Sequence, residues 1–116
     1  MFATLMGLKS ISCDDVKNLL PEQRAAVFDV NARLRWAAAH VPGASNLDPV
    51  HFSEADLPVG KDSQLVFYCS NFMCRKAPLA ARRAKAMGYT NVRVMSAGIQ
   101  GWLGERLPVE VAQADW

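Results

Sequence analysis

Two nearby cysteines, Cys69 and Cys74, are the side chains in this sequence best placed for covalent chemistry. Cys69 ends the apolar run at residues 64–69, which is typical of a buried strand. A helix is expected to begin at Arg75 or Lys76, so a short loop joins the strand to the helix. The N–H groups of such a loop and the positive end of the helix bind anions and favour a thiolate. The pattern therefore predicts a nucleophilic thiol.

Cys69 is the expected nucleophile, because loop amides and cations together lower a cysteine pKa from about 8.5 toward neutrality or below. The alternative is an inert cysteine at a strand end, since buried cysteines are common. Phe72 and Met73, if exposed, would form an apolar rim for a protein or thiol partner. The remainder of the loop and the helix start are expected to bind the substrate, which gives the binding set Ser70, Asn71, Phe72, Met73, Cys74, Arg75 and Lys76.

The charge distribution favours a small anionic ligand. The formal net charge is only +2, but residues 63–104 contain no Asp or Glu. A local positive field of this kind attracts anions. Nucleic-acid binding is not expected, because the sequence does not interleave aromatic and basic residues. The basic residues of this stretch are Arg75, Lys76, Arg82, Arg83, Lys85 and Arg93, of which Arg82, Arg83 and Lys85 are most simply a solvated helix face.

The cysteine content indicates free thiols in a reducing compartment. Cys13, Cys69 and Cys74 are too few for a disulfide framework and have no spacing typical of a zinc site. We expect no metal and no cofactor. Residues 1–8 are mildly apolar but lack a basic leader, and no apolar run approaches the roughly 20 residues of a membrane span. The sequence therefore predicts a cytoplasmic protein without membrane partners.

Strand-like and helix-like segments alternate along the chain. This alternation indicates one α/β domain over residues 1–116 with a mostly parallel sheet. The expected strands are residues 25–30, 45–47, 64–69 and 91–96. The expected helices are residues 12–20, 31–40, 75–87 and 99–105, with a helical turn or loop over 49–57.

Five short blocks, in order, resemble a rhodanese-like domain. They are FDV (28–30), HVPGASN (40–46), VFYC (66–69), GYTNV (88–92) and AGIQGW (97–102). The resemblance covers residues 10–110. It implies a central, mostly parallel five-stranded sheet flanked by helices on both faces, with the nucleophile after the fourth strand.

The resemblance also implies sulfur transfer. Cys69 would take sulfane sulfur from a small anionic donor such as thiosulfate, carry it as a persulfide, and pass it to cyanide, a thiol or a sulfur-accepting protein. Arg75, Lys76 and the loop amides would stabilise the anionic donor and the persulfide.

The loop departs from the usual pattern of the family. From Cys69 to Arg75 it is longer than that of typical sulfurtransferases and lacks glycine, which resembles phosphatases and arsenate reductases of the rhodanese fold. Tyr68 occupies the position where those phosphatases usually have His. Counting back from Gly88 puts Lys76 rather than Arg75 at the family's Arg position. A phosphatase or arsenate reductase and a non-catalytic docking or regulatory module therefore remain alternatives.

Cys74 has three interpretations: a small apolar residue at the helix start, a resolving thiol that converts a Cys69 persulfide or sulfenate into a disulfide, or the nucleophile itself. Asn31 and Arg35 stand where the family commonly has Arg and Glu, which suggests a repacked side of the site. We interpret Asp29 and His40 as structural hydrogen-bonding residues.

Overall fold

Strands and helices alternate along the part of the chain that the computed structural model describes, residues 7–113. The expectation about an N-terminal leader falls mostly on residues 1–6, outside the described residues. The strands are β1 (Lys9–Ser10), β2 (Ala26–Asp29), β3 (Ser45–Asn46), β4 (Leu65–Tyr68) and β5 (Val92–Val94). The helices are α2 (Cys13–Leu19), α3 (Arg33–Ala38), α4 (Lys76–Ala86) and α5 (Gly98–Gly104), with 3₁₀ turns η1 (Pro21–Gln23) and η2 (Glu54–Asp56).

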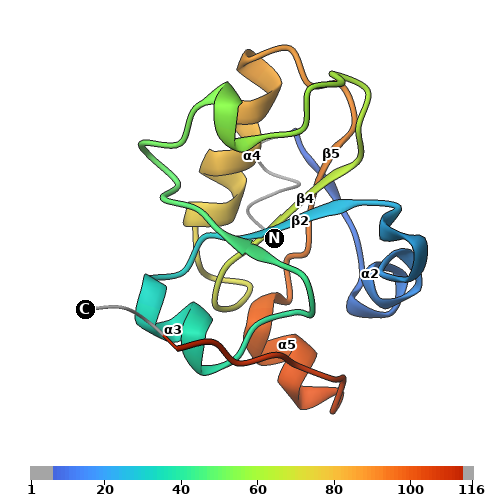
Figure 1. Cartoon of the computed structure of the whole chain (residues 1–116), viewed down its shortest axis with the longest axis vertical. Helices are drawn as coiled ribbons and strands as arrows, with labels where there is room; N and C mark the ends of the chain where they lie inside the picture. Colours follow the sequence, from blue (N-terminus) through green and yellow to red (C-terminus); the bar gives the residue numbers. More distant parts are fainter. Residues whose placement is uncertain (1–6, 114–116) are drawn as a thin grey trace.

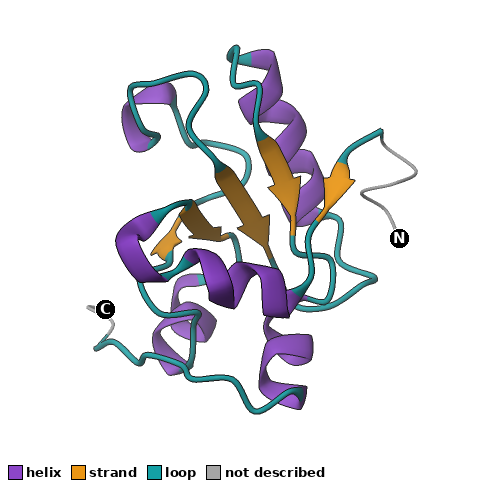
Figure 2. Ribbon diagram, turned by 90° about the vertical axis from the view of Figure 1, so that its right-hand side faces the viewer, coloured by secondary structure: helices purple, strands orange, loops and turns teal. Residues whose placement is uncertain are grey.

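Within residues 7–113, the strands form one five-stranded sheet in the order β1-β5-β4-β2-β3. All neighbouring strands are parallel, with Phe67 of β4 paired to Phe28 on one side and to Val94 on the other. Figure 2 shows the sheet with helices against it. The expected α/β architecture is confirmed. In a parallel sheet the carboxyl ends of the strands meet at one edge, where ligands bind.

The side chains of β4 alternate between the two faces of the sheet, as the period of a strand requires. Leu65, Phe67 and the following Cys69 belong to the apolar cluster that includes α4. Val66 and Tyr68 belong to the second cluster, which includes residues of α2 and α5. The helices therefore cover both faces, as Figure 1 also shows.

Local sequence explains where the helices begin and end. Ser12 caps α2 by accepting a hydrogen bond from the Asp15 N–H at 3.0 Å. Pro78 lies in the first turn of α4, where its missing N–H costs little. Gly88 follows α4 with φ of 102°, a conformation that favours glycine. None of the helices in the described residues is long and apolar enough to cross a membrane.

Two expectations about elements were incomplete. The helix expected over residues 31–40 begins only at Arg33, because the Asp29 carboxylate accepts the Asn31 N–H at 2.8 Å and holds residue 31 in a turn. Strand β1 was not expected, because its two residues are exposed and show no apolar pattern. It is ordered by pairing with β5.

The C-terminal segment after α5 runs back to α3 (Figure 1). Glu110 and His40 exchange two backbone hydrogen bonds of 2.9 Å, and Ala112 N–H donates to the Ala37 carbonyl at 2.8 Å. The His40 ring bonds the Trp36 carbonyl through Nδ1 at 2.7 Å and stacks on the Trp36 ring. These contacts give His40 a structural part, consistent with its interpretation from sequence.

Candidate active site

Cys69 lies at the carboxyl end of the central strand β4 and is 3% exposed. Strand periodicity directs its side chain to the same face as Phe67 and α4. Cys74, near the start of α4, packs partly buried against the same cluster. The two cysteines are joined in a disulfide, with their Cα atoms 6.4 Å apart. The structure thus joins the two cysteines that the sequence singled out. The expectation of free thiols is wrong for this pair, because the loop turns Cys74 back to within disulfide distance of Cys69, and it holds for Cys13.

The first turn of α5 holds the beginning of the loop. Ile99 N–H donates to the Cys69 carbonyl at 2.9 Å, and Gln100 N–H donates to the Ser70 carbonyl at 3.0 Å. In a trans peptide the N–H points opposite to the carbonyl. The amides of Ser70 and Asn71 are therefore directed away from α5. This orientation makes them available to a negative charge at the loop.

Asn71 organises the rest of the loop. Its side-chain oxygen accepts the Met73 N–H at 2.9 Å, and its carbonyl accepts the Cys74 N–H at 3.2 Å. Its side-chain amide donates to Gln100 of α5 at 3.3 Å. The turn that results brings Cys74 back toward Cys69 and leaves Phe72 and Met73 on the surface, 56% and 65% exposed. The two side chains have the exposure that an apolar rim requires.

Arg75 and Lys76 lie at the helix start, as expected. Arg75 is the N-cap residue of α4, and Lys76 is its first residue. Both are exposed. Lys76 also lines a cavity of about 260 Å³ together with Asn31 and Arg33. The charges of Arg75 and Lys76 and the positive end of the α4 dipole therefore lie at the same place, next to the loop.

Asn31 is a site residue outside the binding set predicted from the sequence. Ser70 Oγ donates to Asn31 Oδ1 at 2.9 Å, so Asn31 holds the residue after the nucleophile. Asn31 is itself held by Asn46, whose Nδ2 donates to the Asn31 carbonyl at 2.9 Å. One signal was available: Asn31 follows an expected strand, and the carboxyl ends of neighbouring parallel strands meet.

Buried polar groups support the site from the opposite face of the sheet. Tyr68, directly before the nucleophile, is fully buried, and its hydroxyl accepts the Val41 N–H at 3.0 Å. Burial raises the pKa of the Tyr68 hydroxyl. Burial also raises the pKa of Asp29, although the Tyr68 hydroxyl and the Asn31 amide lower it in part. These groups position the strand ends, as the structural interpretation of Asp29 anticipated.

Cys13 lies apart from the candidate site. It is 2% exposed and belongs to the cluster on the other face of the sheet. Burial, followed by the charge of Glu105, raises its pKa to about 11. A thiol with this pKa stays protonated at neutral pH and is a poor nucleophile. Among the described residues, no group of three His, Cys, Asp or Glu side chains is arranged to hold a metal ion.

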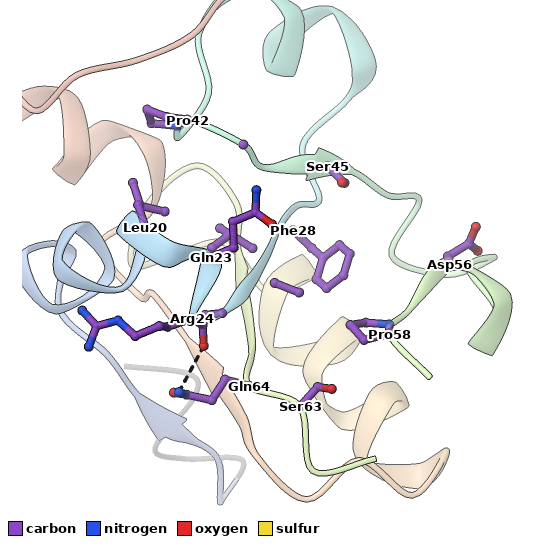
Figure 3. Close-up of a pocket in the computed structure, with 14 residues that line it drawn as sticks. Leu20, Gln23, Arg24, Phe28, Pro42, Ser45, Asp56, Pro58, Ser63 and Gln64 are labelled. Carbon is purple, nitrogen blue, oxygen red and sulfur yellow. Dashed lines mark hydrogen bonds between the residues drawn. The ribbon is translucent and has the colours of Figure 1, made fainter. Parts of the chain in front are cut away.

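A larger cavity of about 760 Å³ lies at the other end of the strands. Figure 3 shows it lined by residues that precede β2 and β4, among them Arg24, Ser63 and Gln64. Two of these lining residues are bonded to each other, because Gln64 Nε2 donates to the Arg24 carbonyl at 3.2 Å. The cavity lining reaches along β2 to Phe28, which pairs with Phe67 of β4, and Cys69 after β4 is not among the lining residues.

Comparisons with known proteins agree on one family. The family model described as rhodanese-like domain matches residues 12–105. The human thiosulfate:glutathione sulfurtransferase is 30% identical, over 85% of this chain and 96% of its own length. A thiosulfate sulfurtransferase of Haemophilus influenzae is 26% identical, over 92% of this chain and 99% of its own length.

A solved structure gives the same result. The solved structure described as a human single-domain sulfurtransferase superposes with a TM-score of 0.69 at 25% identity, over 83% of this chain and 96% of that chain. The match in sequence and the match in fold each extend over most of the chain. The chain belongs to the rhodanese-like domain family.

Proposed function

We propose that the protein transfers sulfane sulfur through a persulfide on Cys69. The observation that carries the proposal is the position of Cys69, at the carboxyl end of the central strand and at the base of a loop leading to the α4 N-terminus. Two relatives, which cover 85% and 92% of the chain, are named as a thiosulfate:glutathione sulfurtransferase and a thiosulfate sulfurtransferase, and this supports the same reaction class.

The reaction begins with the reduced protein, because a cysteine in a disulfide has no thiolate to offer. The Cys69 thiolate attacks the outer sulfur of thiosulfate or a similar donor. A new S–S bond forms, and sulfite leaves with the electron pair of the broken bond. A thiolate or cyanide acceptor then attacks the outer sulfur of the persulfide and regenerates the Cys69 thiolate.

The residues around Cys69 suit anionic reactants. The amides of Ser70 and Asn71 point away from α5, and Arg75 and Lys76 add positive charge at the start of α4. Together they would stabilise the incoming donor, the departing sulfite and the persulfide anion. Phe72 and Met73 provide exposed apolar area beside the loop, where an acceptor thiol or a sulfur-accepting protein would approach.

Cys69→Ser tests the assignment. We expect this variant to lose sulfite release and thiocyanate formation, with thiosulfate as donor and excess cyanide as acceptor, by on the order of 10³-fold or more. Circular dichroism should show an unchanged fold. Cys13→Ser is the matched control and should keep the wild-type rate, because Cys13 lies on the opposite face of the sheet. A Cys69→Ser protein with wild-type rate would show that another group is the nucleophile.

Further assays on the same wild-type preparation distinguish sulfur transfer from the phosphatase, arsenate reductase and docking-module alternatives. Hydrolysis of an aryl phosphate, or reduction of arsenate by a thiol, without any sulfite release from thiosulfate would favour the oxyanion chemistry that the long loop resembles. Inactivity in all of these assays would favour a docking module.

A further inference from the structure

The disulfide between Cys69 and Cys74 connects the proposed nucleophile to a second thiol in its own loop. Their Cα separation of 6.4 Å lies within the roughly 4.4–6.8 Å that disulfides span. With the pair bonded, the Ile99 and Gln100 N–H groups hold the Cys69 and Ser70 carbonyls at 2.9 and 3.0 Å. Bond formation between the two sulfurs is therefore compatible with the loop as the fold positions it.

Other contacts keep Cys74 facing Cys69. The Cys74 N–H donates to the Asn71 carbonyl, and Asn71 is anchored to Gln100 of α5. The Cys74 side chain packs against the apolar cluster to which Cys69 belongs. Exposed Phe72 and Met73 form the tip of the turn between them. The loop thus presents its second thiol toward the interior, where the persulfide would stand, and its apolar side chains toward solvent.

We propose that Cys74 resolves the Cys69 persulfide and releases hydrosulfide. This inference rests on the proposed function, because it requires that the persulfide forms. The Cys74 thiolate attacks Cys69 Sγ, the atom to which it is bonded in the structure. The Cys69–Cys74 bond forms, and the bond from Cys69 Sγ to the outer sulfur breaks. The outer sulfur, which is the anionic atom of the persulfide, takes up the proton that the Cys74 thiol has given up and leaves with the electron pair as hydrosulfide.

The electrons of this step balance within the loop. The sulfane sulfur is reduced to sulfide, and the two cysteine thiols are oxidised to the disulfide. Hydrosulfide is a better leaving group than an alkyl thiolate, because H₂S is the stronger acid. An external dithiol reductant must then reduce the disulfide before another cycle. The overall reaction converts thiosulfate and a dithiol into sulfite, hydrosulfide and a disulfide.

The Cys69 persulfide can therefore react in two ways once it has formed. In the presence of a strong external acceptor, the persulfide sulfur is transferred outward. Without an acceptor, Cys74 converts it to hydrosulfide and leaves the loop as the disulfide seen in the structure. Cys13 cannot substitute for Cys74, since it lies in the cluster on the other face of the sheet.

A single-turnover experiment tests the proposal. The full chain is reduced with a dithiol, freed of reductant under anaerobic conditions and mixed with one equivalent of thiosulfate. Sulfite, hydrosulfide and intact mass are then measured. We expect wild-type protein to release sulfite and hydrosulfide in equal amounts and to become about 2 Da lighter than the reduced chain. Cys13→Ser is the control and should behave identically.

Cys74→Ser should form no hydrosulfide for the sulfite it releases, whatever its rate of sulfite release, and each chain that has released sulfite should stay about 32 Da heavier as a persulfide. Cys74→Ala serves as a second variant if the serine is poorly tolerated. Wild-type protein that keeps the added sulfur and releases sulfite without hydrosulfide would overturn this inference and leave the proposed function standing. Wild-type protein that releases no sulfite would overturn the proposed function, and this inference with it.

Discussion

Cys13 and Cys69 are both buried, but the surroundings of Cys69 favour a thiolate and those of Cys13 favour a neutral thiol. Cys69 follows a strand at the sheet edge where the loop amides and the α4 N-terminus meet. Cys13 lies in the first turn of α2, near the Glu105 carboxylate. A negative neighbour and an apolar cluster favour the neutral thiol. Burial alone therefore does not distinguish a reactive cysteine from an inert one.

The Cys13 thiol should make stability depend on pH in the alkaline range. Its pKa rises from 9.0 to about 11 on folding, so the folded chain keeps a proton that the unfolded chain has lost. Below pH 9.0 the stabilisation is fully present, and it is lost as pH rises toward about 11. We expect a loss of about 2 kcal/mol, absent in Cys13→Ser.

Chemical denaturation of the two reduced proteins at about pH 8.5 and about pH 10.5 measures this difference directly. The comparison with Cys13→Ser removes the contribution of other groups that titrate in the same range. A serine hydroxyl can still donate to Glu105, so the variant should fold. Parallel pH profiles for the two proteins would show that burial does not hold the Cys13 proton.

At the scale of elements, α5 determines where the active-site loop begins. Gly98, its first residue, has φ of 66° and packs against the loop backbone. A Cβ atom at this position would lie 2.5 Å from the Ser70 carbonyl carbon and 2.7 Å from the Asn71 nitrogen. Glycine therefore permits the close approach through which Ile99 and Gln100 bond the Cys69 and Ser70 carbonyls.

Gly98→Ala should displace the loop. We expect the positive φ to cost about 1–2 kcal/mol, with a further cost from the backbone contact. Sulfite release from thiosulfate should fall by on the order of 10²-fold, because misplacement of a reacting group by about 1 Å has effects of that size. Thermal denaturation and the single-turnover assay provide the two measurements.

Gly104→Ala is the matched control in the same helix. A Cβ there meets nothing within 4 Å, and the substitution should change stability by less than about 1 kcal/mol and leave sulfite release unchanged. Wild-type stability and activity in Gly98→Ala would mean that α5 does not set the loop position.

At the scale of the whole molecule, β4 is shared by both apolar clusters. Phe67 is fully buried in the cluster that includes α4, and Trp102 is fully buried in the cluster on the other face. Because adjacent β4 residues serve opposite faces, loss of one cluster removes support from the other. The sheet should therefore unfold as one cooperative unit.

Phe67→Ala tests this coupling. We expect a loss of about 3–5 kcal/mol from the cavity it creates. Tryptophan fluorescence and far-UV circular dichroism should report the same lowered midpoint during denaturation. Val59→Ala, at a side chain 97% exposed, should stay within about 0.5 kcal/mol of wild type. A fluorescence midpoint that remains at its wild-type value in Phe67→Ala would show that the two clusters unfold independently.

The sequence determined the larger part of the fold. Alternation of apolar strands with helical segments predicts the parallel α/β sheet, because a strand buried on both faces must be apolar throughout. The capping residue Ser12 and the terminating residue Gly88 mark helix ends through local hydrogen bonds and backbone conformation. Strand β1 could not be predicted this way, because its pairing with β5 and not its composition makes it a strand.

The sequence by itself also determined the candidate nucleophile, since a cysteine at the end of an apolar strand, before a helix, is a local pattern. Only the tertiary structure decided that Asn31 holds Ser70, that Gly98 lies against the loop, and that Cys74 turns back onto Cys69. Asn31 and Gly98 are distant from the loop in sequence and reach it through neighbouring strands. Cys74 is near in sequence, but the turn around Asn71 is fixed by α5. Local patterns specify elements, whereas the packing of separate elements specifies which side chains meet.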